Sequence, residues 1–201
     1  MKTHNTLFKQ IAKLGLLLMV GLSMTACGAS SEKWKEEVQL SDGKVIVVER
    51  ELIREGGGDE WANNRSLSKP KEYRIQFSDS NDSKKMIEWH STKKSPATWP
   101  EIPLILDVIS GQFVVFSSLA KAGGCQVYNK YLYQNGTWVE EKLPPNFERR
   151  TTNLFVTGNG DALKRFVDVK TKQAIIKEHG GVYPYASYDY VGPTHPNCKG
   201  L

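Results

Sequence analysis

Apolar and polar residues alternate along much of this chain, beginning near residue 34. The clearest case is the segment 72–78, in which Tyr73, Ile75 and Phe77 share one face and the residues between them are polar. Successive side chains of a strand point to opposite faces, so this period of two predicts a half-buried β-strand. A second such segment, 85–91, follows a short polar turn and is its expected partner.

Glycine-containing dipeptides separate three pairs of strand-like segments, at Asp42-Gly43, Ser110-Gly111 and Asn135-Gly136. Asp-Gly and Asn-Gly pairs favour the two-residue hairpin turn in which both positions have positive φ. We therefore expect three hairpins, formed by strands 34–40 with 45–52, 104–109 with 112–117, and 127–134 with 137–141.

The other segments are shorter or less regular. Residues 55–70 contain three consecutive glycines and many small polar residues, which predicts a loop. Three prolines between residues 96 and 103 interrupt the sheet. Further along we expect a short strand at 153–156, a helical turn at 161–165, a hairpin of strands 166–169 and 174–178, and an irregular tail from residue 180.

No long segment with a period of 3.6 appears after residue 26, and short strands recur with turn signals between them. This pattern predicts an all-β or mostly β domain, built as an antiparallel, hairpin-rich sandwich, barrel or meander. Residues 106–112 weakly resemble residues 167–173, as the hairpins of propeller blades resemble one another. Two copies are too few to indicate a repeat architecture, so a propeller is the least favoured arrangement.

The N-terminal residues have a different composition. Lys2, Lys9 and Lys13 form a positive segment without acidic residues, and residues 14–22 are an almost unbroken apolar run. Small residues and a cysteine follow, which is the order typical of a secretory signal peptide. The run is about half the roughly 20 residues that span a bilayer as a helix, so we expect a signal-peptide helix and no permanent transmembrane segment.

The residues that end this signal, Met24-Thr25-Ala26-Cys27, resemble the lipobox of bacterial lipoproteins. The resemblance implies that the chain is cut before Cys27 and that this cysteine receives lipid chains such as palmitate. It also implies export and a lipid anchor in the cell envelope. Gly28 stands where an aspartate would favour the inner membrane, which indicates the outer membrane facing the periplasm. The alternatives are an ordinary cleaved signal with a chance cysteine, or a buried apolar helix.

Cleavage before Cys27 divides the chain into a signal peptide (1–26), a short lipidated linker (27–33) and a single β-rich domain (34–201). The whole chain has 27 basic and 22 acidic residues and a net charge of +5. The signal holds three of the lysines, so the rest has 27 − 3 = 24 basic residues against 22 acidic ones, or +2. So small an excess argues against nucleic acid as a partner.

The remaining cysteines and a group of tyrosines are the other features that we single out. With Cys27 assigned to lipid, Cys125 and Cys198 remain in an oxidising compartment, and we expect them to form a disulfide bond. The irregular tail carries four tyrosines within eight residues, whose rings suit a glycan or a protein surface. Alternatively, they pack the tail onto the sheet: Tyr183, Tyr185, Tyr188 and Tyr190.

Candidate catalytic and metal-binding residues are scattered. No G-x-S-x-G motif occurs, and the single S-x-x-K at residues 91–94 lacks its partner motifs. Glu88 and His90 share one strand face, which a solvated surface explains better than an acid–base pair. Two other groups lack the spacing that zinc or calcium needs: His179, His195 and Cys198, and Asp79, Asn81 and Asp82. We therefore expect no catalytic residue, metal or cofactor.

These observations favour an envelope protein, anchored to a membrane through its N-terminal lipid, with a non-catalytic role in binding or assembly. Its expected partner, besides the membrane, is another envelope protein or a glycan. Two alternatives stay open. One is a structural or phage- or plasmid-borne accessory lipoprotein, and the other is an envelope hydrolase whose site the sequence does not reveal.

Overall fold

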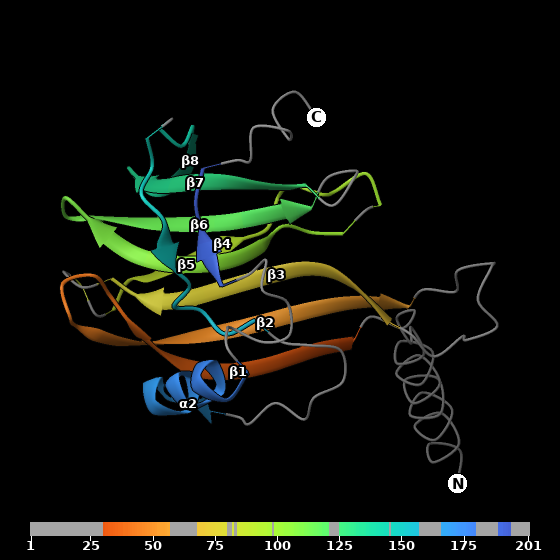
Figure 1. Cartoon of the computed structure of the whole chain (residues 1–201), viewed down its shortest axis with the longest axis horizontal. Coiled ribbons are helices and arrows are strands. Elements are labelled where there is room, and N and C mark those ends of the chain that lie inside the picture. The colour runs from red at the N-terminus through yellow and green to blue at the C-terminus, as the bar shows by residue number, and fades with distance from the viewer. Residues whose placement is uncertain are drawn as a thin grey trace, which may run out of the picture.

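The computed structural model of this chain describes residues 30–56, 68–79, 82, 84–97, 99–120, 125–144, 146–156, 166–179 and 189–193. In this part of the chain the strands form three sheets (Figure 1). The first sheet has the order β10 (Phe166–Val167), β1 (Ser30–Gln39), β2 (Val45–Gly56), β3 (Ser68–Ser78) and β4 (Met86–His90). The second has the order β5 (Ile102–Ile109), β6 (Gln112–Ala120), β7 (Gln126–Gln134) and β8 (Thr137–Glu141). The third pairs β9 (Arg150–Thr151) with β11 (Tyr190–Val191), and a helix, α2 (Val169–His179), contacts β1.

The alternation in the sequence places one face of the first sheet in the core. Tyr73, Ile75 and Phe77 of β3 are buried, and so are Ile87 and Trp89 of the neighbouring β4. Cross-strand register pairs Ile75 with Trp89 and Phe77 with Ile87. The predicted strands at 72–78 and 85–91, and their pairing, are therefore confirmed.

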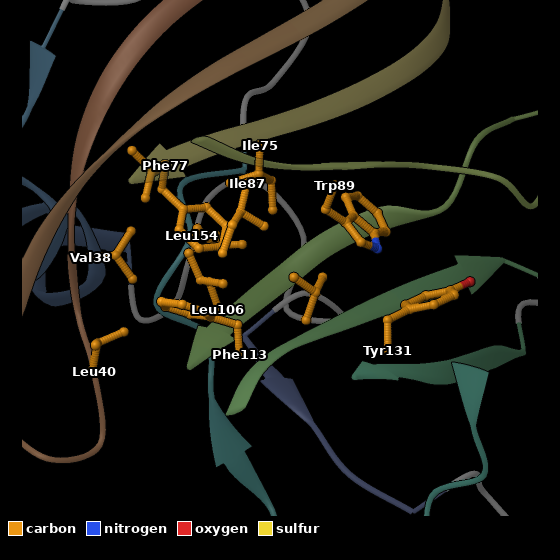
Figure 2. Close-up of a cluster of buried hydrophobic side chains, with 12 residues drawn as sticks. Val38, Leu40, Ile75, Phe77, Ile87, Trp89, Leu106, Phe113, Tyr131 and Leu154 are labelled. Atoms are coloured by element: carbon orange, nitrogen blue, oxygen red, sulfur yellow. The ribbon is translucent and has the colours of Figure 1, made fainter. Parts of the chain in front are cut away.

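The second sheet packs against this buried face, and Figure 2 shows the shared cluster of side chains. The cluster takes members from both sheets: Val38, Leu40, Val48, Ile75, Phe77, Ile87, Trp89, Leu106, Phe113, Val115, Tyr131 and Leu154. The other face of the second sheet carries another cluster, in which Val114 and Phe116 of β6 meet Val156 and Val191. The mostly β, antiparallel fold class is thus confirmed, and two sheets packed face to face give the arrangement of a sandwich.

The hairpin predictions are confirmed at all three glycine dipeptides, although one turn differs in type. Ser110 and Gly111 have φ of 51° and 79°, and Asn135 and Gly136 have φ of 50° and 84°, as a two-residue turn of positive φ requires. In the first hairpin only Gly43 has positive φ (86°), so the expectation for Asp42 is wrong. The Leu40 and Lys44 backbones pair instead across a three-residue loop, with Leu40 N–H donating to Lys44 O at 2.8 Å.

The predicted hairpin at 166–178 is wrong, because most of this segment forms α2. Asp168 caps the helix: its Oδ1 accepts a hydrogen bond from Thr171 N–H at 2.6 Å. The residues read as a turn, 170–173, include lysines and a glutamine, which are good helix formers. Phe166 and Val167 do form a strand, but it pairs in parallel with β1.

Several boundaries also differ from the sequence prediction. Residues 30–33, expected in the linker, belong to β1 and pair with β2. Residues 153–156 are not a strand, although Leu154 and Val156 are buried. The expected loop 55–70 loses its ends to β2 and β3, and residues 57–67 lie outside the described residues, as does the helical turn expected at 161–165.

On each long side of the sandwich, one side chain forms hydrogen bonds that link the edges of the two sheets. On one side, Asn153 accepts from Leu106 N–H at 3.0 Å and donates to Leu106 O at 2.8 Å and Gln39 O at 3.0 Å. It thereby satisfies the edge of β5 and links it to β1. On the other side, Trp138 Nε1 donates to Glu88 O at 2.6 Å, which links β8 to β4. These contacts join the margins of the two sheets, where unpaired strand edges would otherwise face water.

The sandwich has two different ends. The connections β1–β2, β3–β4, β5–β6 and β7–β8 lie at one end, on the left in Figure 1, which we call the turn end. Because β1 runs toward the turn end, its first residue, Ser30, lies at the opposite end. We call this second end the loop end: β2 connects to β3, β4 to β5 and β6 to β7 there, and the first two of these connections are the longest between the strands of the two large sheets.

Candidate functional site

Three carboxylates have no solvent-exposed surface in the described part of the chain: Glu36, Glu101 and Asp107. Burying an ionised carboxylate is costly unless hydrogen bonds or opposite charges compensate it. Each of the three joins segments that are distant in the sequence and is therefore a candidate site. None of the three is among the site residues predicted from the sequence.

Glu101 joins the segment after β4 to the second sheet. Its carboxylate accepts hydrogen bonds from four side chains and two backbone groups: Ser117 Oγ (2.6 Å), Asn129 Nδ2 (3.2 Å), Tyr131 OH (2.8 Å), Thr92 Oγ1 (3.4 Å), Thr92 N–H (3.0 Å) and Lys93 N–H (3.1 Å). The Lys93 ammonium lies on the outer side of this network, 3.2 Å from Asn129 Oδ1. These hydrogen-bond donors compensate the negative charge of the buried Glu101 carboxylate, and no buried cation is needed.

The Glu101 network contains groups that acid–base catalysis uses, namely a carboxylate, a hydroxyl and a phenol. Burial, together with the adjacent Glu101, raises the pKa of Tyr131 far above its usual value, so the phenol stays protonated and donates. Ser117 is fully buried, and its hydroxyl already donates to Glu101. Neither of the hollows described below is lined by Ser117 or Glu101. We therefore interpret this network as structural.

Glu36 of β1 holds two cations and one backbone group. Its carboxylate pairs with Arg50 of β2, lies 2.8 Å from Lys172 Nζ of α2, and accepts from Phe155 N–H at 2.7 Å. Lys172 also donates to Asn153 O at 2.6 Å. Burial lowers the pKa of Lys172, and the neighbouring Glu36 opposes that shift. The cluster fastens both α2 and the 153–155 segment to the first sheet.

The sequence did carry a signal for Glu36. It occupies an inward position between Trp34 and Val38 in the alternation of β1, and Arg50 occupies the next inward position of β2, opposite Trp34. Two charged residues at inward positions of paired strands indicate a buried ion pair. Lys172 could not be inferred in this way, because it comes from a helix that the sequence analysis read as a hairpin.

Asp107 of β5 joins the first hairpin turn to β9. Its Oδ1 accepts from Ser41 N–H at 2.9 Å and from Val108 N–H at 2.8 Å, and its Oδ2 pairs with Arg150. Burial alone would raise the pKa of Asp107, but the hydrogen bonds from Ser41, Arg150 and Val108 outweigh it and hold the pKa below its usual value. The carboxylate is therefore ionised at neutral pH and acts as a structural link.

The surface hollows of the described residues include two that adjoin the first sheet. The smaller, about 210 Å³, lies between β1, the 151–155 segment and α2, and Glu37, Asn153 and Ile175 are among its lining residues. The larger, about 510 Å³, lies on the outer face of the first sheet. Its charged rim consists of cross-strand ion pairs, including Lys35–Glu49 at 2.8 Å and Lys33–Glu51 at 3.3 Å. Opposite charges side by side suit a polar partner surface rather than a single anion or cation.

The predicted cysteine sites are only partly covered by the structure. Cys125 is disulfide-bonded and lies just before β7. Cys198, its expected partner, lies outside the described residues, so this pairing stays a prediction. Cys27 also lies outside them. Where the structure is described, it contains no helix long and apolar enough to cross a membrane.

Of the four tail tyrosines, only Tyr190 lies within the described residues. Its ring is covered by Arg149, whose Cζ lies 3.2 Å from the ring centroid, and packs at 6.5 Å from the ring of Tyr128. Tyr190 thus packs against the body of the domain, as the alternative expected, and a ligand-binding role for its partly exposed ring stays a prediction. The other three fall outside the described residues: Tyr183, Tyr185 and Tyr188.

The remaining candidate catalytic and metal-binding residues lie on the surface or in a turn, wherever they fall within the described part of the chain. Glu88 and His90 are exposed on the outer face of β4. Asp82 Oδ1 accepts from Lys84 N–H at 3.0 Å within the β3–β4 turn, as in an ordinary turn of aspartate and asparagine. No group of three or more metal-ligand side chains comes together among the described residues. Asn81 and His195 lie outside them, and His179 is placed only as the last residue of α2.

No protein family, no curated protein and no solved structure matches this chain.

Proposed function

We propose that this chain is a bacterial envelope protein, anchored by lipid on Cys27, that works by binding or assembly rather than by catalysis. The observation that carries the proposal is the order of the first 27 residues, where a basic segment and an apolar run precede Met24-Thr25-Ala26-Cys27. Acyl chains on a terminal cysteine hold a protein at a membrane, because each buried CH₂ contributes about 0.8 kcal/mol. Gly28 supports placement at the outer membrane, facing the periplasm.

The polar interior supports the non-catalytic part of the proposal. The buried carboxylates Glu36, Glu101 and Asp107 each accept several hydrogen bonds that join distant segments. A catalytic carboxylate would instead reach a cleft where substrate binds. The arrangement suits a rigid scaffold that presents a surface.

The anchor is tested by the Cys27→Ser variant, expressed as the full chain in a bacterial host and followed by envelope fractionation and mass spectrometry. We expect the wild type to fractionate with membranes and to carry acyl chains on residue 27. The variant should lose the acyl mass and the processing that follows acylation. Cys198→Ser is the control for loss of a cysteine: it removes the predicted disulfide with Cys125, but it should keep both the acyl mass and the processing. A Cys27→Ser chain that still has the mass of the mature, acylated protein would disprove the lipid assignment.

The binding role is tested on the outer face of the first sheet. This face has the larger hollow and the exposed apolar side chains Val45, Val47 and Met86. A photo-crosslinking residue at Val47 (51% exposed) should give one defined adduct in intact cells. The same residue at Val139 of β8 (43% exposed) is the matched control on the other sheet. Absence of any adduct from Val47, with the protein present in the envelope, would contradict a partner on this face.

A further inference from the structure

The loop end of the sandwich is the end nearest to the proposed anchor. Cross-strand register places Ser30 opposite Arg54 and, one position further along β2, Glu55 opposite Lys69. The starts of β1 and β3 therefore lie at the same end of the first sheet. Only Gly28 and Ala29 lie between Cys27 and Ser30, and the three steps from Cys27 to Ser30 can span at most about 10 Å.

An exposed tryptophan is held in place at this end. Trp99 is 44% exposed and lies in a short hairpin, where Ser95 N–H donates to Trp99 O at 2.7 Å. Trp99 N–H donates in return to Ser95 Oγ at 3.1 Å. Lys69 Nζ lies 5.7 Å from the centroid of the indole ring and donates to Ala97 O at 2.8 Å. These contacts fix the hairpin against the start of β3 and leave the indole open to solvent.

Two more exposed lysines belong to the same two segments as Lys69 and Trp99. Lys71 is exposed on β3, close to Lys69, and Lys94 is exposed in the same hairpin as Trp99. We call Lys69, Lys71, Lys94 and Trp99 the loop-end patch. One exposed tryptophan is ordinary on a protein surface. Here it is combined with lysines and lies at the end of the domain from which the anchor leaves.

This combination has the chemistry of a membrane interface. Tryptophan is enriched at the level of lipid headgroups, because its ring is apolar and its N–H is polar. Lysines near an anionic leaflet are attracted to lipid phosphates, and the attraction fades within a Debye length of about 8–10 Å. A connection of about 10 Å from the anchor is short enough to bring the patch within that range.

We propose that the loop-end patch rests on the anionic phospholipid surface, with Trp99 in the headgroup layer and the turn end directed away from the membrane. This inference rests on the proposed lipid anchor at Cys27, since the anchor is what brings the loop end to the bilayer. The outer face of the first sheet then stands upright on the membrane, open to a partner in the adjacent aqueous space.

The test uses the full-length protein purified from bacterial membranes and reconstituted into vesicles of phosphatidylcholine, with or without an equal part of phosphatidylglycerol. Flotation of the vesicles reports anchoring. Quenching of tryptophan emission by phosphatidylcholine brominated on its acyl chains reports depth. The chain has five tryptophans, so the contribution of Trp99 is the difference between the wild type and Trp99→Phe. Trp138→Phe is the matched control, because Trp138 is the second residue of β8 and lies near the turn end.

We expect the protein to float, Trp99→Phe to lose most of the quenchable emission, and Trp138→Phe to keep it. The loss should be larger when phosphatidylglycerol is present. A protein that floats but is quenched equally with and without Trp99 would overturn the orientation while leaving the anchor in place. A protein that does not float would overturn the anchor and the orientation together.

Discussion

Replacing Glu101 with glutamine tests the interpretation of its network as structural. Glu101→Gln keeps the shape of the side chain but turns one acceptor oxygen into an NH₂ group. At the Oε2 position that group would face three donors: Ser117 Oγ, Asn129 Nδ2 and Tyr131 OH. The two hydroxyls can rotate to accept, but the Asn129 amide nitrogen cannot.

The magnitude follows from these contacts. Hydrogen bonds to a charged group contribute about 1.5–3 kcal/mol each, and a buried donor without a partner costs about 1–3 kcal/mol. The variant weakens the hydrogen bonds that the charged carboxylate accepted, and it leaves the Asn129 amide as a buried donor without a partner. We therefore expect it to lower the free energy of unfolding by about 3–5 kcal/mol. For a domain of this size, such a loss lowers Tm by about 10 °C.

The assay is thermal unfolding followed by circular dichroism, with Glu140→Gln as the matched control. Glu140 is 49% exposed and pairs with Lys93 Nζ at 2.5 Å, so its replacement removes the same charge at the surface. An exposed ion pair contributes about 0–1 kcal/mol, and the control should melt close to the wild type. Equal melting temperatures for the two variants would refute the structural role assigned to Glu101.

Three further predictions concern other sites. The pKa of Asp107 is lower in the folded state than in the unfolded one, so its contribution to stability is present above pH of about 4 and is lost as pH falls further. Asp107→Asn should therefore flatten the acid side of a plot of Tm against pH, and an unchanged acid side would contradict this. Gly136 has φ of 84°, so Gly136→Val should cost about 1–3 kcal/mol in chemical denaturation, whereas Gly136→Asn, which tolerates positive φ, should cost less. Mass spectrometry of alkylated, non-reduced protein should find Cys125 joined to Cys198; this bond encloses a loop long enough to contribute about 4 kcal/mol, and a labelled Cys198 would exclude it.

The hairpins and the strand at 72–78 could be predicted because their causes are local. Gly111 and Gly136 adopt positive φ at little cost, and the alternation around Ile75 decides which face is buried without reference to other strands. The segment of α2 was predicted as a hairpin, although its own residues contain a signal for a helix. In the weak echo between 106–112 and 167–173, Lys172 stands where the first copy has Gly111. Lysine does not favour the positive φ of that turn, and Asp168 caps a helix instead.

By itself, the sequence determined the strand pattern, the tight turns and the mostly β class, and it predicts the signal and the anchor at Cys27. The tertiary structure decided which strands share a sheet, where α2 docks and which charges are buried. Glu36 meets Lys172, and Asn153 meets both Leu106 and Gln39, only after the two sheets have packed. An 11-residue helix is marginal alone, so its stability depends on such contacts. Their energy comes from partners distant along the chain, and a reading of neighbouring residues does not contain that information.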